Sequence, residues 1–134
     1  MEQVVIDTNV LISATLSPQG NPAEIMMKVS YGELQLIYSS DIMNEYTKVL
    51  AYDRLNISQT TQDKVIEGIR KKGKLINPTV STIALPDEDD RFFYDAAKES
   101  GATLITGNIK HFTNEPFIVT PADFIAKYNV MSNE

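Results

Sequence analysis

The feature that most constrains this chain is a short apolar run near its first residue that leads directly into a carboxylate. Val4, Val5 and Ile6 are followed by Asp7, and an apolar pattern typical of a helix begins at Val10. A continuous apolar run indicates a strand buried on both faces, as in a parallel sheet covered by helices. Ligands of open α/β folds bind beyond the carboxyl ends of such strands, so Asp7 is a candidate site residue.

Strand-like and helix-like segments alternate along the rest of the chain. Further strands are predicted at 34–38, 75–83, 103–106 and 117–119, and helices are predicted to begin near residues 10, 21, 39, 58, 90 and 120. The strand at 75–83 is weak because Asn77 and Pro78 interrupt it. Alternating strands and helices imply right-handed crossovers onto a mostly parallel sheet, so we predict one α/β domain over residues 1–134.

Composition limits the classes of function. Cysteine is absent, which excludes disulfides, thiolate nucleophiles and Cys-based zinc sites. A net charge of −6 argues against broad, salt-driven adhesion to nucleic acid, because that attraction needs Lys and Arg facing phosphates. Apolar stretches are far shorter than the roughly 18 residues that cross a bilayer, and the first residues do not resemble a signal peptide. We therefore expect a cytoplasmic protein with no membrane partner.

Oxygen-bearing side chains fall where an α/β fold would bring them to one edge of the sheet. Asp7 follows the first predicted strand, and Glu45 lies in the helix after the second strand. Residues 87–90 lie at the start of the helix that precedes the fourth strand, and residues 106–108 lie at the end of that strand. Oxygen ligands of this kind suit a hard cation such as Mg²⁺ or Mn²⁺. A metal held there can activate water and neutralise charge on a phosphodiester.

Each of these residues also has an ordinary structural explanation. An aspartate such as Asp7 often caps a helix, and Glu45 fits a solvated helix face. The acids at 87–90 suit a helix N-terminus, but four adjacent carboxylates repel one another beyond what capping needs. Asn108 fits a turn, and the lone His111 fits an ordinary surface residue.

In this order and spacing, four blocks resemble the PIN-domain nucleases over nearly the whole chain. The blocks are Val5–Leu11, Ser40 with Glu45, Asp87–Phe93, and Leu104–Asn108 with Lys110–Phe112. The resemblance implies a three-layer α/β sandwich whose mostly parallel five-stranded sheet has the order 3-2-1-4-5. It also implies an acidic pocket that binds Mg²⁺ or Mn²⁺ and hydrolyses RNA.

The resemblance assigns roles to individual residues. The catalytic, metal-binding acids correspond to Asp7, Glu45 and Asp90, with Asp87 as an accessory acid. The polar residues expected beside them are Asn9, Ser40 and Thr106.

One position departs from the family pattern. Many members end the fourth block in Thr-Gly-Asp, whereas this chain has Asn108. An amide oxygen can still ligate metal, but without charge it would hold a second cation less tightly. The enzyme could therefore use one metal ion or have low activity. Asp87 and Asp123 are both candidates to replace the acid that is missing at position 108.

The prediction is thus a metal-dependent endoribonuclease. The subgroup it resembles most is the toxins of prokaryotic toxin–antitoxin pairs, which implies an antitoxin partner and a homodimer. Residues predicted to hold RNA are Arg70, Lys71, Lys72, Lys74 and Lys110. A solvated helix end explains the first four equally well.

Two alternatives come from other classes of protein. The first is a PIN-like protein-binding module with little or no turnover. The features that favour it are Asn108 and the net negative charge of the chain. The second is a phosphotransfer domain of receiver or phosphatase type. Such phosphatases need a second aspartate where this chain has Asn9, and receivers need a lysine where it has Thr120.

Overall fold

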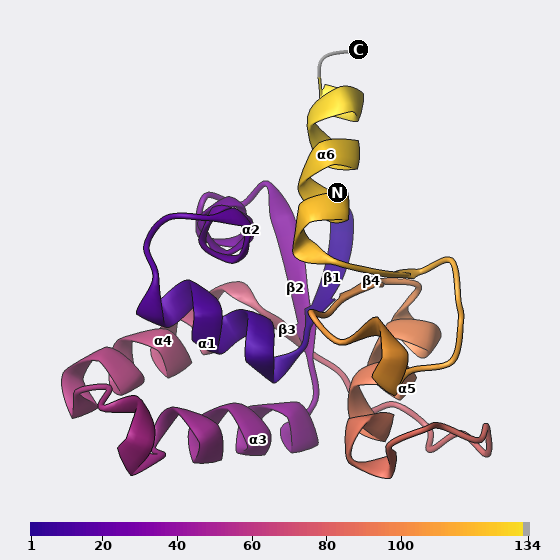
Figure 1. Cartoon of the computed structure of the whole chain (residues 1–134), viewed down its shortest axis with the longest axis horizontal. Helices are drawn as coiled ribbons and strands as arrows, with labels where there is room; N and C mark the ends of the chain where they lie inside the picture. Colours follow the sequence, from indigo (N-terminus) through magenta and orange to yellow (C-terminus); the bar gives the residue numbers. More distant parts are fainter. Residues whose placement is uncertain (133–134) are drawn as a thin grey trace.

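A five-stranded parallel sheet runs through the middle of the molecule (Figure 1). The computed structural model describes the backbone of residues 1–132 and the side chains of residues 1–130. The strands are β1 (Glu2–Ile6), β2 (Leu34–Tyr38), β3 (Lys74–Leu75), β4 (Thr103–Ile105) and β5 (Ile118–Val119). Their order is β3-β2-β1-β4-β5, and all neighbouring strands are parallel, so the predicted sheet is confirmed.

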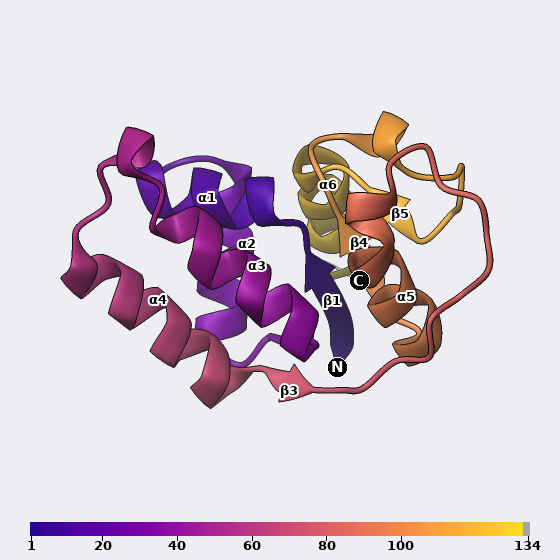
Figure 2. The ribbon, with the colours of Figure 1, turned by 90° about the horizontal axis from the view of Figure 1, so that it is seen from below.

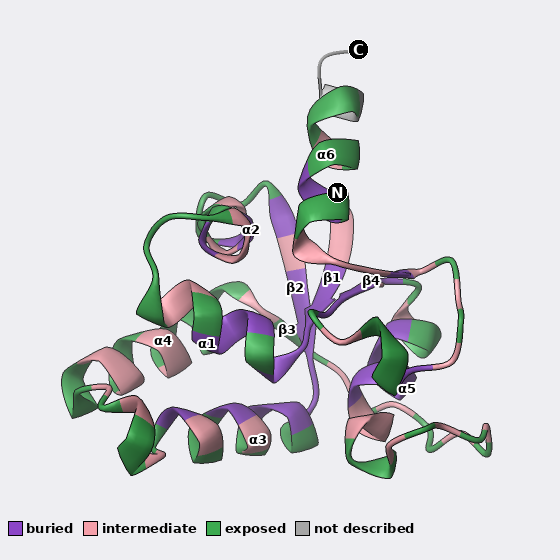
Figure 3. Ribbon diagram, in the orientation of Figure 1, coloured by how far each residue is buried: buried purple, intermediate pink, exposed green. Residues whose placement is uncertain are grey.

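Strand β1 lies at the centre of the sheet, where its apolar run is covered on every side. Val4, Val5 and Ile6 are each 0–1% exposed. Val4 pairs with Leu36 of β2 on one side and with Thr103 of β4 on the other. Figure 3 shows that burial is concentrated on these strands, while the outer sides of the helices face solvent. The sheet therefore places Asp7, the next residue, at its carboxyl edge.

Helices cover both faces of the sheet, as predicted for a three-layer sandwich. The α-helices are α1 (Thr8–Leu16), α2 (Asn21–Ser30), α3 (Ser40–Leu50), α4 (Gln59–Lys72), α5 (Arg91–Ser100) and α6 (Pro121–Ser132). The 3₁₀ helices are η1 (Asp53–Leu55), η2 (Glu88–Asp90) and η3 (Ile109–His111). Helices α1, α2 and α4 lie on one side of β1, and α5 lies on the other (Figures 1 and 2). Within residues 1–132, no helix has the length and hydrophobicity that a bilayer crossing requires.

Local capping chemistry sets the starts of two helices. At α3, Ser39 Oγ accepts a hydrogen bond from the Ile42 backbone N–H at 3.2 Å. At α6, Thr120 Oγ1 accepts one from the Asp123 N–H at 3.1 Å. Both bonds satisfy donors that a helix N-terminus leaves without an intrahelical partner.

The predicted third strand is much shorter than expected. β3 contains only Lys74 and Leu75, which pair with the end of β2. Residues 76–87 form neither helix nor strand, so the prediction of a strand as far as residue 83 is wrong. Pro78 has no backbone N–H for a sheet hydrogen bond, and the chain instead crosses from β3 to η2 (Figure 2).

Side chains of α5, Arg91 foremost, hold this irregular segment in place. The Arg91 guanidinium donates to the Ser81 carbonyl at 3.0 Å and to the Ile83 carbonyl at 2.6 Å. It also pairs with Glu88 at 2.6 Å. The buried Asp95 accepts from the Ser81 N–H at 3.2 Å. These contacts fix the path along which the chain enters η2.

The strand order also distinguishes this fold from one of the alternatives. Receiver-type domains have the order 2-1-3-4-5. Here β2 lies between β1 and β3, and β4 lies on the other side of β1. The fold therefore does not support the receiver interpretation.

Candidate active site

Acidic side chains from three separate segments line one hollow at the carboxyl edge of the sheet. Asp7 follows β1, Glu45 lies on α3, and Asp87, Asp89 and Asp90 lie in or beside η2. We call this hollow, which has a volume of about 250 Å³, the acidic pocket. The parallel topology brings these segments together because consecutive strands end at the same edge.

Asp7 lies in a buried position and is held by a hydroxyl. Its side chain is among the buried polar groups, at 5% exposure. Thr106 Oγ1 donates to Asp7 Oδ2 at 2.6 Å, and the same hydroxyl oxygen accepts the Asn108 backbone N–H at 3.0 Å. Although Asp7 precedes α1, its side chain makes no helix-capping hydrogen bond in the described structure. The described hydrogen bonds therefore give no support to the cap interpretation of Asp7.

A buried tyrosine attaches α3 to the end of β1. The hydroxyl of Tyr46, which is 0% exposed, donates to the Ile6 carbonyl. Burial, and then the nearby charge of Asp7, raise the pKa of this tyrosine, so it stays protonated. Glu45, the preceding residue, is half-buried and reaches the acidic pocket from the same helix.

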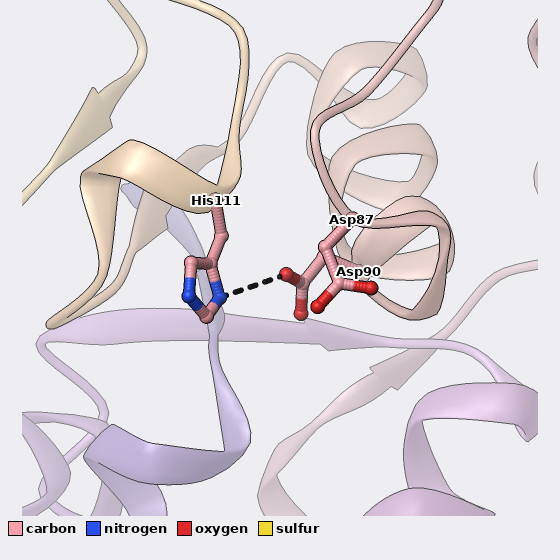
Figure 4. Close-up of side chains that lie close together, drawn as sticks. All are labelled: Asp87, Asp90 and His111. Carbon is pink, nitrogen blue, oxygen red and sulfur yellow. Dashed lines mark ion pairs between the residues drawn. The ribbon is translucent and has the colours of Figure 1, made fainter.

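His111, Asp87 and Asp90 form the most compact group of ligand atoms (Figure 4). One such atom from each residue lies within 4.8 Å of the other two. His111 Nδ1 lies 3.3 Å from Asp90 Oδ2. Asp87 Oδ1 also accepts the Asp89 backbone N–H at 3.0 Å. The three side chains come from η3 and from η2 with its N-cap, two segments that only the tertiary fold brings together.

The carboxyl groups of the acidic pocket are partly buried and lie close together, which disfavours their ionised forms. Burial raises the pKa of Asp7, against the lowering effect of the Thr106 hydrogen bond. Burial, together with the charges of Asp7 and Asp87, raises the pKa of Asp90 to about 6. A bound cation would reverse both effects, because it favours the ionised carboxylates.

The donor set fits a divalent cation. Most of the candidate ligands are carboxylate oxygens, which hard cations prefer. Thr8 also lines the pocket, is 6% exposed, and its Oγ1 has no hydrogen-bond partner among the described residues. Asp90 Oδ2 makes no hydrogen bond in that part of the chain either, but it lies 3.3 Å from the His111 imidazole. Buried polar atoms left in this way are candidates to face an ion or its bound water.

Other predicted residues lie around or away from this pocket. Asn9 lines it and is exposed. Asn108 does not belong to its lining, and the described hydrogen bonds of this residue are made by its backbone, to the Thr106 hydroxyl and to the His111 N–H. Ser40 lies at the start of α3 in a neighbouring hollow that also contains Asp95.

The two candidates to replace the acid missing at position 108, Asp87 and Asp123, lie in different hollows. Asp87 lines the acidic pocket. Asp123 instead lines a separate hollow with Glu2, Thr103 and Val119, residues of β1, β4 and β5.

The predicted RNA-binding residues are spread over several surfaces. Arg70 borders a hollow between α3 and α4, and Lys71 and Lys72 border an apolar cavity between α1, α2 and α4. Lys74 is exposed on β3, and Lys110 is exposed on η3 beside His111. None of the five is among the residues that line the acidic pocket.

Two ionisable residues of the pocket, Arg54 and His111, are absent from the site residues that the sequence predicts. Arg54 of η1 lines it, with its guanidinium 5.2 Å from the centre of the Tyr52 ring. No sequence signal identifies Arg54, because its position depends on the turn that follows α3. As the lone histidine, His111 fits a surface residue by its type, and its place in the fourth family block is the signal that points to the pocket.

Comparisons with known proteins agree with the fold. An uncharacterized protein of Methanocaldococcus jannaschii, MJ1680, is 31% identical over 109 residues, covering 79% of this chain and 70% of that protein. The crystal structure of VapBC2 from Rickettsia felis bound to a DNA fragment from their promoter contains a similar chain. That match has a TM-score of 0.58 and 13% identity, and covers 88% of this chain and 96% of that one. The family model for the PIN domain matches residues 3–110, and the chain therefore belongs to the PIN domain family.

Proposed function

We propose that this protein is a divalent-metal-dependent endoribonuclease. The main support is the convergence of Asp7, Glu45 and Asp90 from three segments on one acidic pocket. The raised pKa values of Asp7 and Asp90 indicate that the protein leaves their negative charge poorly compensated. A bound Mg²⁺ or Mn²⁺ would supply that compensation, polarise a phosphate and lower the pKa of a water molecule.

The side chains of the pocket have distinct roles in this proposal. Asp7 and Asp90 hold the metal, and the hydroxyl of Thr106 fixes one oxygen of Asp7 so that the carboxylate keeps its orientation. Glu45 reaches the pocket from α3 and positions the attacking water. Asn9, at the pocket edge, orients ligands by hydrogen bonds. No side chain attacks the phosphate covalently, because water is the nucleophile.

Basic residues would hold the RNA backbone at increasing distances from the scissile bond. Arg54 lines the acidic pocket, so we assign it to the phosphate closest to the reaction. Lys110 is exposed on η3, beside the pocket residue His111. Residues assigned to more distant phosphates are Arg70, Lys71, Lys72 and Lys74.

A pair of charge-matched variants tests the nuclease assignment. We expect Asp7→Asn to lower the rate of RNA cleavage about 100-fold or more, because the metal loses its most buried carboxylate. Asp123→Asn removes the same charge from a hollow separate from the acidic pocket and should cleave at the parental rate. EDTA should abolish cleavage, and Mn²⁺ should restore it. Equal rates for Asp7→Asn and the parent protein would refute the assignment.

We further propose that the protein acts in the cytoplasm as the toxin of a toxin–antitoxin pair. The fold likeness to VapBC2 of Rickettsia felis supports this role. An antitoxin would block the acidic pocket by inserting a basic or polar side chain, because clustered carboxylates bind guanidinium and ammonium groups strongly. Co-purification with the product of an adjacent gene would support the pairing. Recovery of this chain without a partner from native cells would oppose it.

Self-association is proposed on the basis of exposed apolar side chains. Met27 is 49% exposed and Tyr31 is 71% exposed, both near the end of α2. Burying such side chains favours association, so we propose a homodimer. Light scattering coupled to size-exclusion chromatography would measure the mass of the particle in solution.

A further inference from the structure

One part of the acidic pocket is lined by apolar and basic side chains. Val49, in the last turn of α3, belongs to this part of the lining, as do Tyr52, just after that helix, and Arg54 of η1. Helix α3 extends away from α5, so its last turn and η1 lie at the end of the pocket remote from η2 (Figures 1 and 2). We call Tyr52 and Arg54 the aromatic corner of the pocket.

The guanidinium of Arg54 contacts an aromatic ring although carboxylates line the same pocket. Its central carbon, Cζ, lies 5.2 Å from the centre of the Tyr52 ring. Among the described residues, no carboxylate lies within ion-pair distance of Arg54. An arginine that lies over a ring retains N–H donors at the edge of its planar group. The aromatic corner therefore combines donors that suit a phosphate with a ring that suits a base.

The ring of Tyr52 does not serve the hydrophobic core. Tyr46, which lies on the same side of η1 in the chain, is 0% exposed and belongs to the core. Tyr52 is half-buried, and within the described residues it belongs neither to the core nor to the half-buried apolar side chains packed against it. Core packing therefore does not explain the position of this ring, which is available to a ligand of the pocket.

Backbone hydrogen bonds hold the aromatic corner in place. The Tyr52 N–H donates to the Val49 carbonyl at 3.1 Å, and the Leu55 N–H donates to the Tyr52 carbonyl at 3.1 Å. Asn56, in the left-handed conformation with φ 51°, ends η1. A surface that is already ordered in this way loses little conformational freedom when a ligand binds.

We propose that the aromatic corner binds an RNA base that flanks the scissile bond, with a preference for purines. The inference rests on the proposed function, because the acids at the other end of the pocket hold the cleaved phosphate in that proposal. Aromatic rings and guanidinium groups stack on unpaired bases. Purines are preferred because their two fused rings offer a larger stacking surface than the single ring of a pyrimidine. Tyr52 is thus a specificity residue, and Arg54 contacts both this base and a phosphate.

A fluorescent variant tests base binding directly. The chain contains no tryptophan, so Tyr52→Trp provides a single indole in the pocket. In Mg²⁺, adenosine 5′-monophosphate should quench the fluorescence of this indole in a saturable manner, and cytidine 5′-monophosphate should bind more weakly. Ribose 5-phosphate carries the same phosphate without a base and should not quench it.

Tyr128 provides a matched control outside the acidic pocket. This tyrosine is also half-buried, and Lys28 Nζ lies 4.6 Å from the centre of its ring. It lines the hollow that contains Asp123. Tyr128→Trp should therefore show no saturable quenching by adenosine 5′-monophosphate. Equal quenching of the two variants would mean that the nucleotide does not bind at the aromatic corner, and would overturn the proposal.

Cleavage by the full chain separates a substrate contact from a structural role. Tyr52→Leu should raise KM for RNA about fivefold or more, because a stacking contact is lost, with a much smaller change in kcat. Sequencing the products of a random-sequence RNA should show a purine at a fixed position beside the cut for the parental protein. Tyr52→Phe should retain this preference, and Tyr52→Leu should lose it. A purely structural role would lower kcat and leave the preference unchanged.

The outcomes distinguish this inference from the proposed function. Asp7-dependent cleavage with the same base preference in Tyr52→Leu and the parental protein would overturn the base contact and leave the nuclease proposal intact. Cleavage that does not depend on Asp7 would refute the nuclease proposal, whereas saturable quenching of Tyr52→Trp would still support nucleotide binding at the aromatic corner. Tyr52→Trp keeps an aromatic side chain, so the fluorescence test does not depend on how well Tyr52→Leu folds.

Discussion

Asp7 occupies a position where aspartate often serves only as a helix cap, directly between a buried strand and a helix. Its side chain instead accepts a hydrogen bond from Thr106, which lies 99 residues later in the chain. Both residues are buried, so this carboxylate is removed from water and its pKa is raised. A buried carboxylate with one hydroxyl donor gains stability when a cation approaches, which is the physical basis for its proposed role.

Asp90 provides a prediction at the residue scale. Its pKa is raised from 3.8 to about 6, so the charged form is disfavoured in the folded protein. The metal-free protein should therefore lose stability as pH rises from 3.8 to about 6, the range in which this carboxyl is ionised in the unfolded chain but still protonated in the fold, whereas Asp90→Asn should not. We expect Asp90→Asn to raise the melting temperature at pH 7.5 by about 5 °C.

Thermal unfolding in EDTA from pH 4.5 to 8 measures this effect. The advantage of Asp90→Asn should shrink as pH falls below 6, because the parental carboxyl then becomes protonated in the folded state. Asp53→Asn, an exposed change in η1, is the matched control. A constant advantage over the whole pH range would contradict the assigned pKa.

At the scale of elements, the irregular segment before η2 determines where Asp87 and Asp90 lie. Residues 76–87 have neither helix nor strand to fix their path. Arg91 supplies that constraint by contacting Ser81, Ile83 and Glu88. The bonds connect the beginning of α5 to the irregular segment before it. The position of η2, and hence of Asp90, depends on this arginine.

Replacing Arg91 should therefore affect activity through geometry. We expect Arg91→Ala to lower the cleavage rate about tenfold or more, because displaced carboxylates no longer hold the metal at the correct distance. Limited proteolysis should show faster cutting within residues 76–87.

Lys98→Ala is the control for this prediction, since it removes a cation from the exposed side of the same helix. That variant should keep the parental rate and digestion pattern. Unchanged proteolysis of Arg91→Ala would show that other contacts hold the segment.

At the scale of the whole molecule, the parallel sheet places every chain segment of the acidic pocket at one edge. The central position of β1 puts Asp7 between α3 on one side and η2 on the other. The chain carries a net charge of −6, and part of this charge is concentrated in the pocket. Folding brings these like charges together, and a cation would offset the repulsion.

Metal binding should consequently stabilise the whole fold. At a concentration 100-fold above its dissociation constant, Mn²⁺ should add about 2.7 kcal/mol to the free energy of unfolding. Urea denaturation with and without Mn²⁺ measures the difference. Asp7→Asn should lose most of this gain, while Asp123→Asn should retain it. An equal gain for both variants would mean that the ion binds elsewhere.

The sequence by itself determined the class of fold and most of the acids that meet. The apolar run before Asp7 specified a strand buried on both faces, and the alternation of strands and helices specified a parallel sheet. These features are local, because hydrophobic periodicity and capping act over a few residues. Glu45 and Asp90 followed from their places after and before predicted elements.

Only the tertiary structure decided how the ends of those elements are arranged. The paths of irregular segments determine several features at once. They limit β3 to two residues, and they place Arg54, His111 and Asp87, but not Asp123, in the lining of the acidic pocket. Those paths are set by contacts between residues far apart in the chain, such as the hydrogen bond between Thr106 and Asp7. A local sequence pattern carries no information about such contacts, because they form only when folding brings distant segments of the chain together.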